Sequence, residues 1–252
     1  MIEKKNVVPF GCGVNSVAMM IELVKRSVHV DYILFANTGG WSNLGEKHET
    51  YRYKRFFSNW LKSKGYPEIK TVVYNSEGLY NEMIRLGTIP SIAFGWKTCS
   101  IKWKIYASDK YLKAKGVKIK HKILGYDAGE SHRTDTDYTE ENVSFWYPLV
   151  DWGLDRMDCV KIIIDAGLPL PPKSSCFFCP NMQAWEIHQL KEEDPCRFDH
   201  AVKMEINAQD KLTKLRGLSG KKKWSEIITQ PFLPMPEDEQ FELEKMPCSC
   251  SI

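Results

Sequence analysis

Segments with the pattern of a β-strand alternate with helical segments along the chain up to about residue 166, and this alternation limits the fold to a few classes. Residues 6–10 are apolar and β-rich, residues 16–24 carry apolar side chains at helical spacing, and Gly-Cys-Gly joins the two. The pattern continues with strands expected at 29–40, 68–75 and 117–126 and helices at 49–64, 79–86 and 100–114. Strands separated by helices predict an α/β fold with a doubly wound, mostly parallel, Rossmann-like sheet.

The sequence changes character after this alternation. Residues 127–144 are polar and predict a loop, and a short ordered segment follows at 147–152. Residues 154–166 predict an amphipathic helix with Met157, Val160, Ile163 and Ile164 facing inward. We expect three parts, namely an α/β domain at 1–166, a Cys-bearing helical region at 167–216 packed on it, and an extended C-terminal arm at 217–252.

Composition excludes several classes of protein. Of the 252 residues, 43% are hydrophobic and 27% charged, as in ordinary soluble proteins. No stretch has the length of apolar residues that spans a bilayer, and the N-terminus leads into a strand instead of an apolar signal segment. We therefore expect a cytoplasmic protein with no membrane partner. A net charge of +3 is too small to indicate nucleic-acid binding by itself, and the lysines at 221–223 are typical of a solvated surface.

Three polar turns follow predicted strands, and their coincidence indicates a binding site. The carboxyl ends of parallel strands meet at one edge of a sheet, where ligands bind. In the first turn Gly11 and Gly13 permit close backbone approach, while Asn15 and Ser16 offer side chains at a helix N-terminus.

The other two turns add polar contacts. The second contains Asn37, Thr38 and Gly39, which can contact a base or sugar through polar side chains and backbone. The third runs from Gly125 to Arg133 and includes Glu130 and His132, so it supplies a carboxylate, an imidazole and a permanent cation suited to phosphate or sulfate. For each residue taken singly, an ordinary polar surface position is the better explanation, but three coincident turns predict an anion or nucleotide site.

These turns resemble the motifs of a known group. PFGCGVNS resembles the PP-loop of the adenine nucleotide alpha-hydrolase superfamily (HUP type), FANTGG resembles its FxDTG turn, and GYDAGESHR resembles a turn of the phosphoadenosine phosphosulfate (PAPS) reductase family. TCSIKWKI, YPLVDW and CFFCP continue the resemblance in the same order, over roughly residues 5–215.

The resemblance implies roles for individual residues. The PP-loop positions that would hold phosphate or sulfate are Gly11, Cys12, Gly13, Asn15 and Ser16, with Gly125 beside them and Asn37, Thr38 and Gly39 holding the adenosine. Arg133, Glu130 and Lys104 would be the catalytic residues. The loop also departs from the family pattern, because Val14 replaces a frequent lysine, Asn15 an acidic residue and Cys12 the second glycine. Lys102, Lys104 or Arg133 would have to compensate for the lost charge.

Eight cysteines in a reducing compartment indicate metal binding or redox chemistry more than disulfides. The two-residue spacing of Cys176 and Cys179 lets both thiolates face one ion. The resemblance makes Cys99 the third ligand, because family members place cluster ligands with a similar long gap before a CxxC. Cys196 is the preferred fourth ligand, and the Cys248/Cys250 pair is the alternative. Thiolates suit zinc or an iron–sulfur cluster such as 4Fe–4S.

Other interpretations of the cysteines stay open. CxxC can be a redox dithiol without metal, and Cys159, on an apolar helical face, is expected in the core. The C-terminal KMPCSCSI does not match the catalytic segment of sulfonucleotide reductases.

The function that the resemblance implies is that of a PAPS-reductase-like enzyme that binds an adenine nucleotide, either ATP or a sulfonucleotide (PAPS or APS). It would reduce the sulfonucleotide, or use ATP, usually with magnesium, to activate an acceptor for nucleic-acid thiolation. The alternative is a non-catalytic nucleotide sensor or a metal-stabilised subunit of a larger nucleic-acid modification or defence system. A third hypothesis is a zinc-stabilised interaction protein that uses Trp185 and the lysines at 221–223 as a partner surface. A nucleic-acid or protein acceptor and a homo-oligomer are left open.

Overall fold

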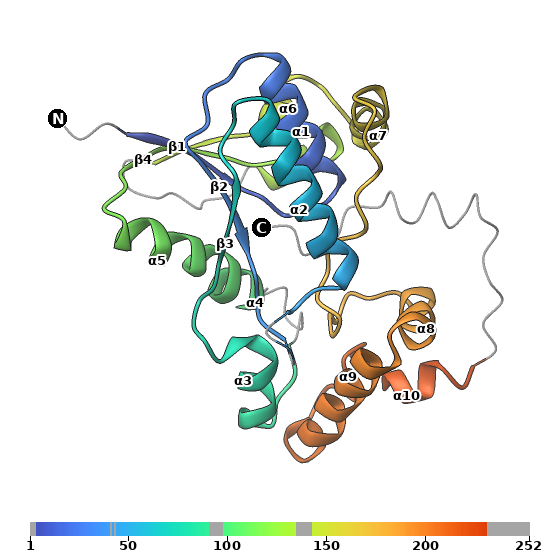
Figure 1. Cartoon of the computed structure of the whole chain (residues 1–252). Coiled ribbons are helices and arrows are strands. Elements are labelled where there is room, and N and C mark those ends of the chain that lie inside the picture. Colours follow the sequence, from blue (N-terminus) through green and yellow to red (C-terminus); the bar gives the residue numbers. More distant parts are fainter. Residues whose placement is uncertain (1–3, 41, 43, 91–97, 135–142, 231–252) are drawn as a thin grey trace.

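The computed structural model describes residues 4–40, 42, 44–90, 98–134 and 143–230. Its centre is a five-stranded sheet with the order β3-β2-β1-β4-β5, in which each pairing is parallel (Figure 1). The strands are β1 (Lys5–Pro9), β2 (Tyr32–Ala36), β3 (Ile69–Val72), β4 (Ile119–Ile123) and β5 (Ser144–Trp146). The predicted α/β fold with a parallel sheet is therefore confirmed.

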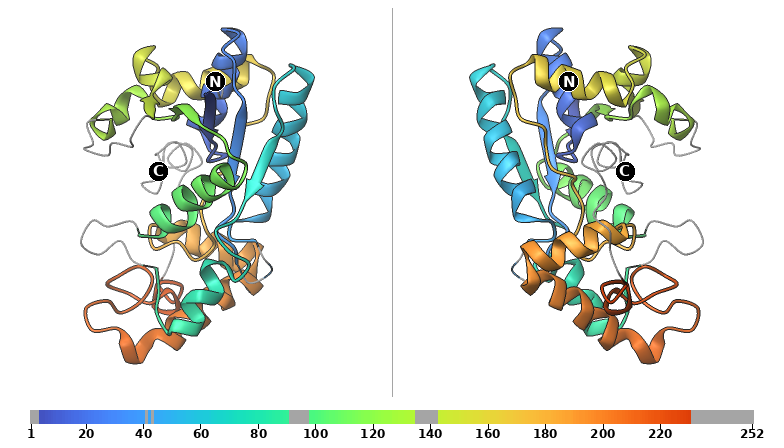
Figure 2. Two further views of the ribbon diagram at one scale, coloured as in Figure 1. Left: turned by 90° about the vertical axis from the view of Figure 1, so that its left-hand side faces the viewer. Right: turned by 90° about the vertical axis from the view of Figure 1, so that its right-hand side faces the viewer.

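Helices cover both faces of the sheet, as expected for a doubly wound fold. The helices of this part are α1 (Val14–Lys25), α2 (His48–Ser63), α3 (Gly78–Leu86), α4 (Thr98–Ser100), α5 (Tyr106–Ala114), α6 (Pro148–Asp151) and α7 (Arg156–Asp165). A π-helical turn at Ile101–Ile105 joins α4 to α5, and a 3-10 helix spans Ala128–Arg133. Figure 2 shows α2 and α5 on opposite sides of the sheet.

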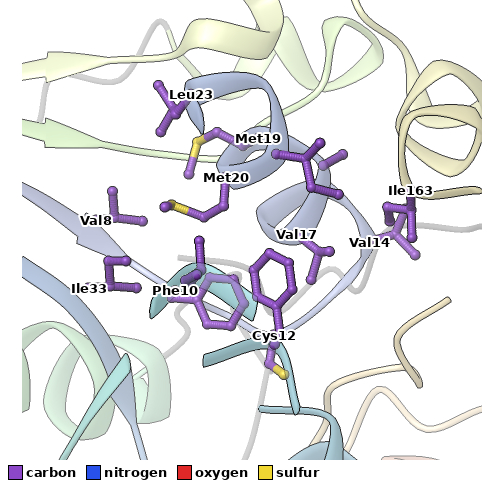
Figure 3. Close-up of a cluster of buried hydrophobic side chains, with 14 of the residues drawn as sticks. Val8, Phe10, Cys12, Val14, Val17, Met19, Met20, Leu23, Ile33 and Ile163 are labelled. Carbon is purple, nitrogen blue, oxygen red and sulfur yellow. The ribbon is translucent and has the colours of Figure 1, made fainter. Parts of the chain in front are cut away.

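The alternation of side chains along the strands supplies two separate cores. On β2, Ile33 and Phe35 face the core shared with α1, α2 and α7, whereas Leu34 and Ala36 face α5. Figure 3 shows the first of these cores, in which Cys12 is buried with side chains of β1 and α1. Cys12 belongs to the loop between β1 and α1, which we call the PP-loop after the motif that its sequence resembles. The core on the α5 side lies mainly over β1, β2 and β3.

The C-terminal helices pack around a third core that includes α3. They are α8 (Ala184–Glu193), α9 (Pro195–Ala208) and α10 (Trp224–Ile227), with a 3-10 turn at Gln209–Lys211. The third core contains Leu79 and Tyr80 of α3 together with Phe177, Phe178 and Trp224. The expected domain boundary at residue 166 stays a prediction. The helix α3, which precedes this boundary, shares a core with the helices α8, α9 and α10, which follow it.

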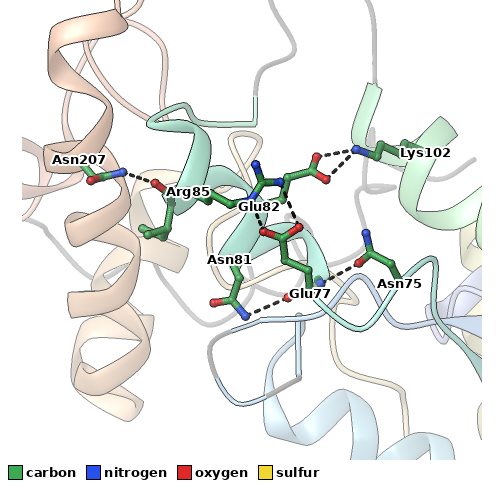
Figure 4. A network of polar contacts seen from close by, with 9 residues as sticks. Asn75, Glu77, Asn81, Glu82, Arg85, Lys102 and Asn207 are labelled. Atoms are coloured by element: carbon green, nitrogen blue, oxygen red, sulfur yellow. Dashed lines mark hydrogen bonds and ion pairs between the residues drawn. The ribbon is translucent and has the colours of Figure 1, made fainter.

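A polar network braces α3 on its outer side (Figure 4). Arg85 of α3 pairs with Glu77, the residue before the helix begins, and Lys102 pairs with Glu82 at 2.6 Å. Asn207 of α9 donates to the backbone carbonyl of Ile84. These contacts tie α3 to α9 and to the segment that precedes α5.

The structure differs from the sequence-based expectations at four places. Met157 and Ile164 on α7 are 50% and 56% exposed, because the buried stripe is centred on Cys159, Val160 and Ile163 and the other two side chains lie about 100° from its centre. The strand β5 was not predicted, since three residues are too short to show a period. In the region expected to be helical as far as residue 216, α9 already ends at Ala208.

The fourth difference concerns residues expected at the surface. Trp185, expected on a partner surface, is a buried residue of α8. Residues 217–230, expected in an extended arm, include α10 with its buried Trp224. The rest of the arm, residues 231–252, lies outside the described residues. Within the described ranges, none of the helices is sufficiently long and apolar to cross a membrane.

Candidate functional site

The PP-loop connects β1 to α1 and leaves open space on its inner side. Gly13 caps the helix: its N–H donates to Ser16 Oγ at 3.1 Å, and the Ser16 hydroxyl donates back to the Gly13 carbonyl at 2.9 Å. A Cβ added at Gly11 or Gly13 would meet no atom within 4 Å. Cys12 takes the left-handed region with φ 61° and turns its thiol into the core. The glycines thus leave room for a ligand next to the backbone.

A cavity of about 110 Å³ adjoins this loop at the carboxyl ends of β1, β2 and β4. Residues 9–11 and 13–16 form one wall, residues 34–36 another and residues 124–126 a third. We call it the first cavity. A Cβ on Gly125 would lie 3.2 Å from the Ser16 Cα, so glycine allows the end of β4 to pack closely on the PP-loop.

Three cationic side chains line the first cavity, namely Lys104, Arg156 and Lys173. Arg156 Nη1 donates to Asn15 Oδ1 at 2.7 Å, and Lys173 pairs with Glu186 at 2.9 Å. Lys104 is a residue that the sequence predicts for the site, whereas Arg156 and Lys173 are not. The sequence contains one indication of a role for Arg156. It is the first residue of α7, and the helix dipole disfavours a cation at a helix N-terminus.

Asn15 is a hub of buried polar contacts. Its side-chain nitrogen donates to Asp127 Oδ2 at 2.8 Å and to Glu130 Oε2 at 3.0 Å, while its oxygen accepts from Arg156. Asp127 and Glu130 are 3% and 5% exposed. An acidic residue at position 15 would add a third carboxylate to a buried pair, whereas an amide can donate to both. The departure from the acidic family pattern therefore has a structural cause in this chain.

Arg133 lies on the far side of this hub. It forms an ion pair with Glu130, and its guanidinium carbon lies 4.2 Å from the centre of the Tyr126 ring. It lines a different cavity, described below, and is absent from the described lining of the first cavity. The structure thus brings the predicted catalytic residues Glu130 and Arg133 together, whereas Lys104 lines the first cavity.

The turn after β2 braces the site instead of lining the first cavity. Asn37 Oδ1 accepts from the N–H groups of Gly39 and Gly45, at 3.1 and 3.2 Å, and from the Tyr51 hydroxyl at 2.8 Å. Gly39, with φ +76°, packs against Gly78 so closely that an added Cβ would lie 2.6 Å from the Gly78 Cα. None of residues 37–39 belongs to the described lining of the first cavity.

A second, smaller cavity of about 30 Å³ collects three of the predicted ligand cysteines. Cys99, Cys176 and Cys179 line it together with Thr38, whose hydroxyl lies 3.2 Å from Cys176 Sγ. Cys196 is exposed in the first turn of α9 and does not line it. Cys248 and Cys250 lie outside the described residues. As expected, Cys159 is buried in the core.

The three thiols are not arranged as a closed ligand set. In the part of the chain that the structure describes, no group of three or more His, Cys, Asp or Glu side chains could hold a metal ion. Burial, together with the nearby Glu46 carboxyl, raises the pKa of Cys176 to about 12. A metal bound at this cavity would require the cysteines as thiolates. The positive charge of the metal would favour loss of the thiol protons.

The first and second cavities share two lining residues, Lys104 and Ser174. Glu46 lies beside them: it is buried, lines the first cavity, and accepts a hydrogen bond from the Ser174 hydroxyl at 2.7 Å. Burial raises the pKa of Glu46, and Lys104 acts in the opposite direction. A bridge between the backbones of Glu46 and Cys176 holds the two segments together. No sequence motif marked Glu46 as a site residue.

Comparisons with known proteins give little further guidance. No family model matches the sequence, and no curated protein matches it. Among solved structures, the chain is similar to a phosphoadenylyl-sulfate (PAPS) reductase from Candida auris in a phosphate complex. The identity is 14%, the TM-score is 0.43, and the match covers 67% of this chain and 74% of that chain. Similarity at this level carries no argument about function, so the fold assignment depends on the parallel sheet itself.

Proposed function

We propose that the chain binds an adenine nucleotide in the first cavity and carries out sulfur-related chemistry at the adjoining cysteines. The observation that supports this most directly is the shared wall between the two cavities, formed by Lys104 and Ser174. A nucleotide whose phosphate or sulfate lies near Lys104 would have its reacting end next to Cys176. Neither cavity alone would suggest such a reaction.

Charge and loop geometry support an anionic ligand. The free N–H groups at the start of α1 carry the positive end of the helix dipole, and Lys104, Arg156 and Lys173 add cationic side chains. The ends of β2 and β4 provide apolar walls for the adenosine. Glu46 is the carboxylate of the described lining, so it is the residue we assign to magnesium if the phosphates bring the ion with them.

The chemistry has two versions, and both use the same groups. In sulfonucleotide reduction a cysteine thiolate attacks the sulfur, a sulfur–sulfur bond replaces the bond from sulfur to the phosphate oxygen, and adenosine phosphate leaves, with Lys104 and Arg156 stabilising the departing charge. A second thiol then releases sulfite and is oxidised, with the first cysteine, to a disulfide. In the ATP version these cations hold the pyrophosphate while an acceptor is activated for thiolation. A nucleic acid is the acceptor we favour, and assembly into a homo-oligomer stays a prediction.

Cys99, Cys176 and Cys179 are the residues that would hold zinc or an iron–sulfur cluster, with a fourth ligand from outside the described cavity lining. Thiolates suit both metals, and the three thiols line one small cavity, but they would have to move closer together to hold a shared ion. When bound, such a group would keep the thiolates deprotonated and join the segment of Cys99 to the segment of Cys176 and Cys179. Thr38 would then hold Cys176 in place through its hydroxyl.

Calorimetry with ATP, PAPS and APS tests the binding step. Arg156→Ala should weaken nucleotide binding by more than roughly 1.5 kcal/mol, because a charge-assisted contact to phosphate is lost. Arg55→Ala, an exposed arginine on α2, is the matched control. Equal affinities for the parent and Arg156→Ala would exclude the first cavity as the phosphate site.

The alternative of a non-catalytic sensor has one observation in its favour. Asn15, at the acidic position of the PP-loop motif, is fully engaged with Asp127, Glu130 and Arg156. A chain that only senses the nucleotide would bind ATP but release neither AMP nor pyrophosphate in the presence of candidate acceptors. Product analysis by chromatography distinguishes the two functions.

A further inference from the structure

A third cavity, of about 210 Å³, lies between α5 and the strands β1, β4 and β5. It is larger than the first cavity and shares Pro9, Ser108, Leu124 and Tyr126 with it. The two therefore adjoin along the end of β4. The nucleotide assigned to the first cavity leaves the third one without a ligand.

The walls of the third cavity combine flat aromatic rings with apolar side chains. Tyr126 and Tyr147 stack with their ring centres 5.5 Å apart and their planes at 9°. Phe145 of β5 and Leu112 of α5 add apolar surface. Aromatic rings of this kind commonly stack with nucleobases, because each base has an apolar π-face.

The cavity also contains a polar pair. Lys122 Nζ lies 2.8 Å from Asp109 Oδ1, and the Lys122 side chain is only 7% exposed. Removing an ion pair from water costs free energy, so a cavity for a purely apolar ligand would be expected to lack one. An ammonium donor next to a carboxylate acceptor matches the edge of a heterocyclic base, which presents both acceptors and donors.

A chain of contacts connects this cavity to the PP-loop. Asn15 donates to Glu130, Glu130 pairs with Arg133, and the Arg133 guanidinium lies over Tyr126, which lines both cavities. A ligand that moves Asn15 would therefore also shift Arg133 and Tyr126 in the wall of the third cavity. The first cavity thus lies between the cysteines on one side and this aromatic space on the other.

We propose that the third cavity binds a nucleobase ring of the acceptor. This inference rests on the proposed function in one respect, since it assumes that the adenine nucleotide occupies the first cavity. The ring stacks against Tyr147 and Tyr126, and its edge pairs with Lys122 and Asp109. A nucleic-acid acceptor would present such a base next to the nucleotide that activates it.

Ligand binding measured by saturation-transfer NMR tests this assignment. Uridine, cytidine and guanosine are titrated separately into the full chain saturated with ATP. At least one of them should bind, and Ile105→Trp, which fills the third cavity, should weaken that binding at least tenfold while the ATP affinity changes less than twofold. Tyr147→Leu should also weaken nucleoside binding. It replaces Ile105→Trp in the test if circular dichroism shows that Ile105→Trp does not fold.

The matched control is Tyr106→Leu, because Tyr106 is 51% exposed and does not belong to the described lining of the third cavity. It should leave nucleoside binding unchanged. Lys122→Met and Asp109→Asn should alter the preference among the three nucleosides, since the hydrogen-bonding edge is read by this pair.

Three results would overturn the inference. The first is that none of the nucleosides binds to the parent chain, and the second is that Ile105→Trp and Tyr147→Leu bind them as well as the parent does. The third is a tenfold loss of ATP affinity in Ile105→Trp, which would assign the cavity to the adenine of the nucleotide itself. If the parent binds nucleosides but no adenine nucleotide, the proposed function fails and the base site stands.

Discussion

The side-chain nitrogen of Asn15 lies 3.0 Å from Glu130 Oε2, and this contact joins the PP-loop to the turn after β4. The two residues are far apart in the sequence, and both are buried. Because Glu130 also pairs with Arg133, the amide connects the nucleotide cavity to the aromatic cavity beyond it.

Asn15→Asp should destabilise the fold by roughly 2 kcal/mol at neutral pH, because it replaces a donor by a third carboxylate beside Asp127 and Glu130. The like charges raise the pKa of the introduced carboxyl in the folded state, so the penalty is present while that carboxyl is ionised and shrinks as pH falls and it becomes protonated. Urea unfolding at neutral and at acidic pH measures it. Asn59→Asp, at an exposed position of α2, is the control and should show no comparable loss of stability. An Asn15→Asp variant as stable as the parent would contradict the role of Asn15 in linking the two buried carboxylates.

Gly13→Val should abolish nucleotide binding without unfolding the chain. The Gly13 backbone, with φ −99° and ψ 175°, is open to any residue, and an added Cβ meets no protein atom. The β-branched side chain would instead occupy the space next to the N–H groups that we assign to phosphate. Calorimetry and thermal melting on the same sample check both halves, and unimpaired nucleotide binding by Gly13→Val would place the ligand elsewhere.

Glu205→Ala should lower the free energy of unfolding by about 3 kcal/mol, because buried N–H donors lose their acceptor. The Glu205 carboxylate, 1% exposed, accepts from the N–H of Leu218 at 2.7 Å and from that of Trp224 at 2.9 Å. It thereby fastens residues 217–224 to α9. Chemical unfolding measures the loss, and Glu205→Gln, which keeps one acceptor oxygen, should lose less.

Glu205 also predicts a pH dependence of known sign. Burial raises the pKa of this carboxyl above its ordinary value of 4.5. The folded state therefore binds a proton more readily than the unfolded state, and stability increases as pH falls through the folded pKa toward 4.5. The difference in unfolding free energy between the parent and Glu205→Gln, followed over pH, isolates this contribution. A difference that is constant across the window would contradict the raised pKa.

Serine at Cys99, Cys176 or Cys179 should remove bound metal and lower the melting temperature, because ligation adds its binding free energy to folding. Cys196→Ser should retain the metal, since Cys196 is exposed and does not line the second cavity. Cys159→Ala is the control for a buried thiol outside the site. Metal content by mass spectrometry and the absorbance of anaerobically purified protein decide between zinc and iron–sulfur.

The outcome of this series also identifies the fourth ligand. Loss of metal in Cys248→Ser or Cys250→Ser would assign it to the C-terminal segment. Loss in Cys196→Ser would mean that α9 moves toward the cysteine cavity when metal binds. Full metal content in both Cys99→Ser and Cys176→Ser would remove the site.

Sequence patterns alone determined the α/β class, the position of the glycine loop between β1 and α1, and the burial of Cys159. These features are local, because a strand or helix is encoded by the period of its apolar residues and a tight turn by its glycines. The same local patterns also located Cys176 and Cys179 near one another. They could not reveal β5, which is too short to have a period.

Only the tertiary structure decided which side chains meet. Arg156 donates a hydrogen bond to Asn15, which lies 141 positions earlier in the chain. The backbone of Glu46 forms a β-bridge with that of Cys176, and no sequence motif near Glu46 predicts this contact. Arg133 pairs with Glu130 and lines the aromatic cavity, a placement that its position in the third polar turn does not reveal. Met157 and Ile164 are apolar but exposed, because α1 covers only the centre of the α7 stripe. The period of a segment shows which of its side chains share a face, but the partner of that face is set by the packing of segments that are distant in the sequence.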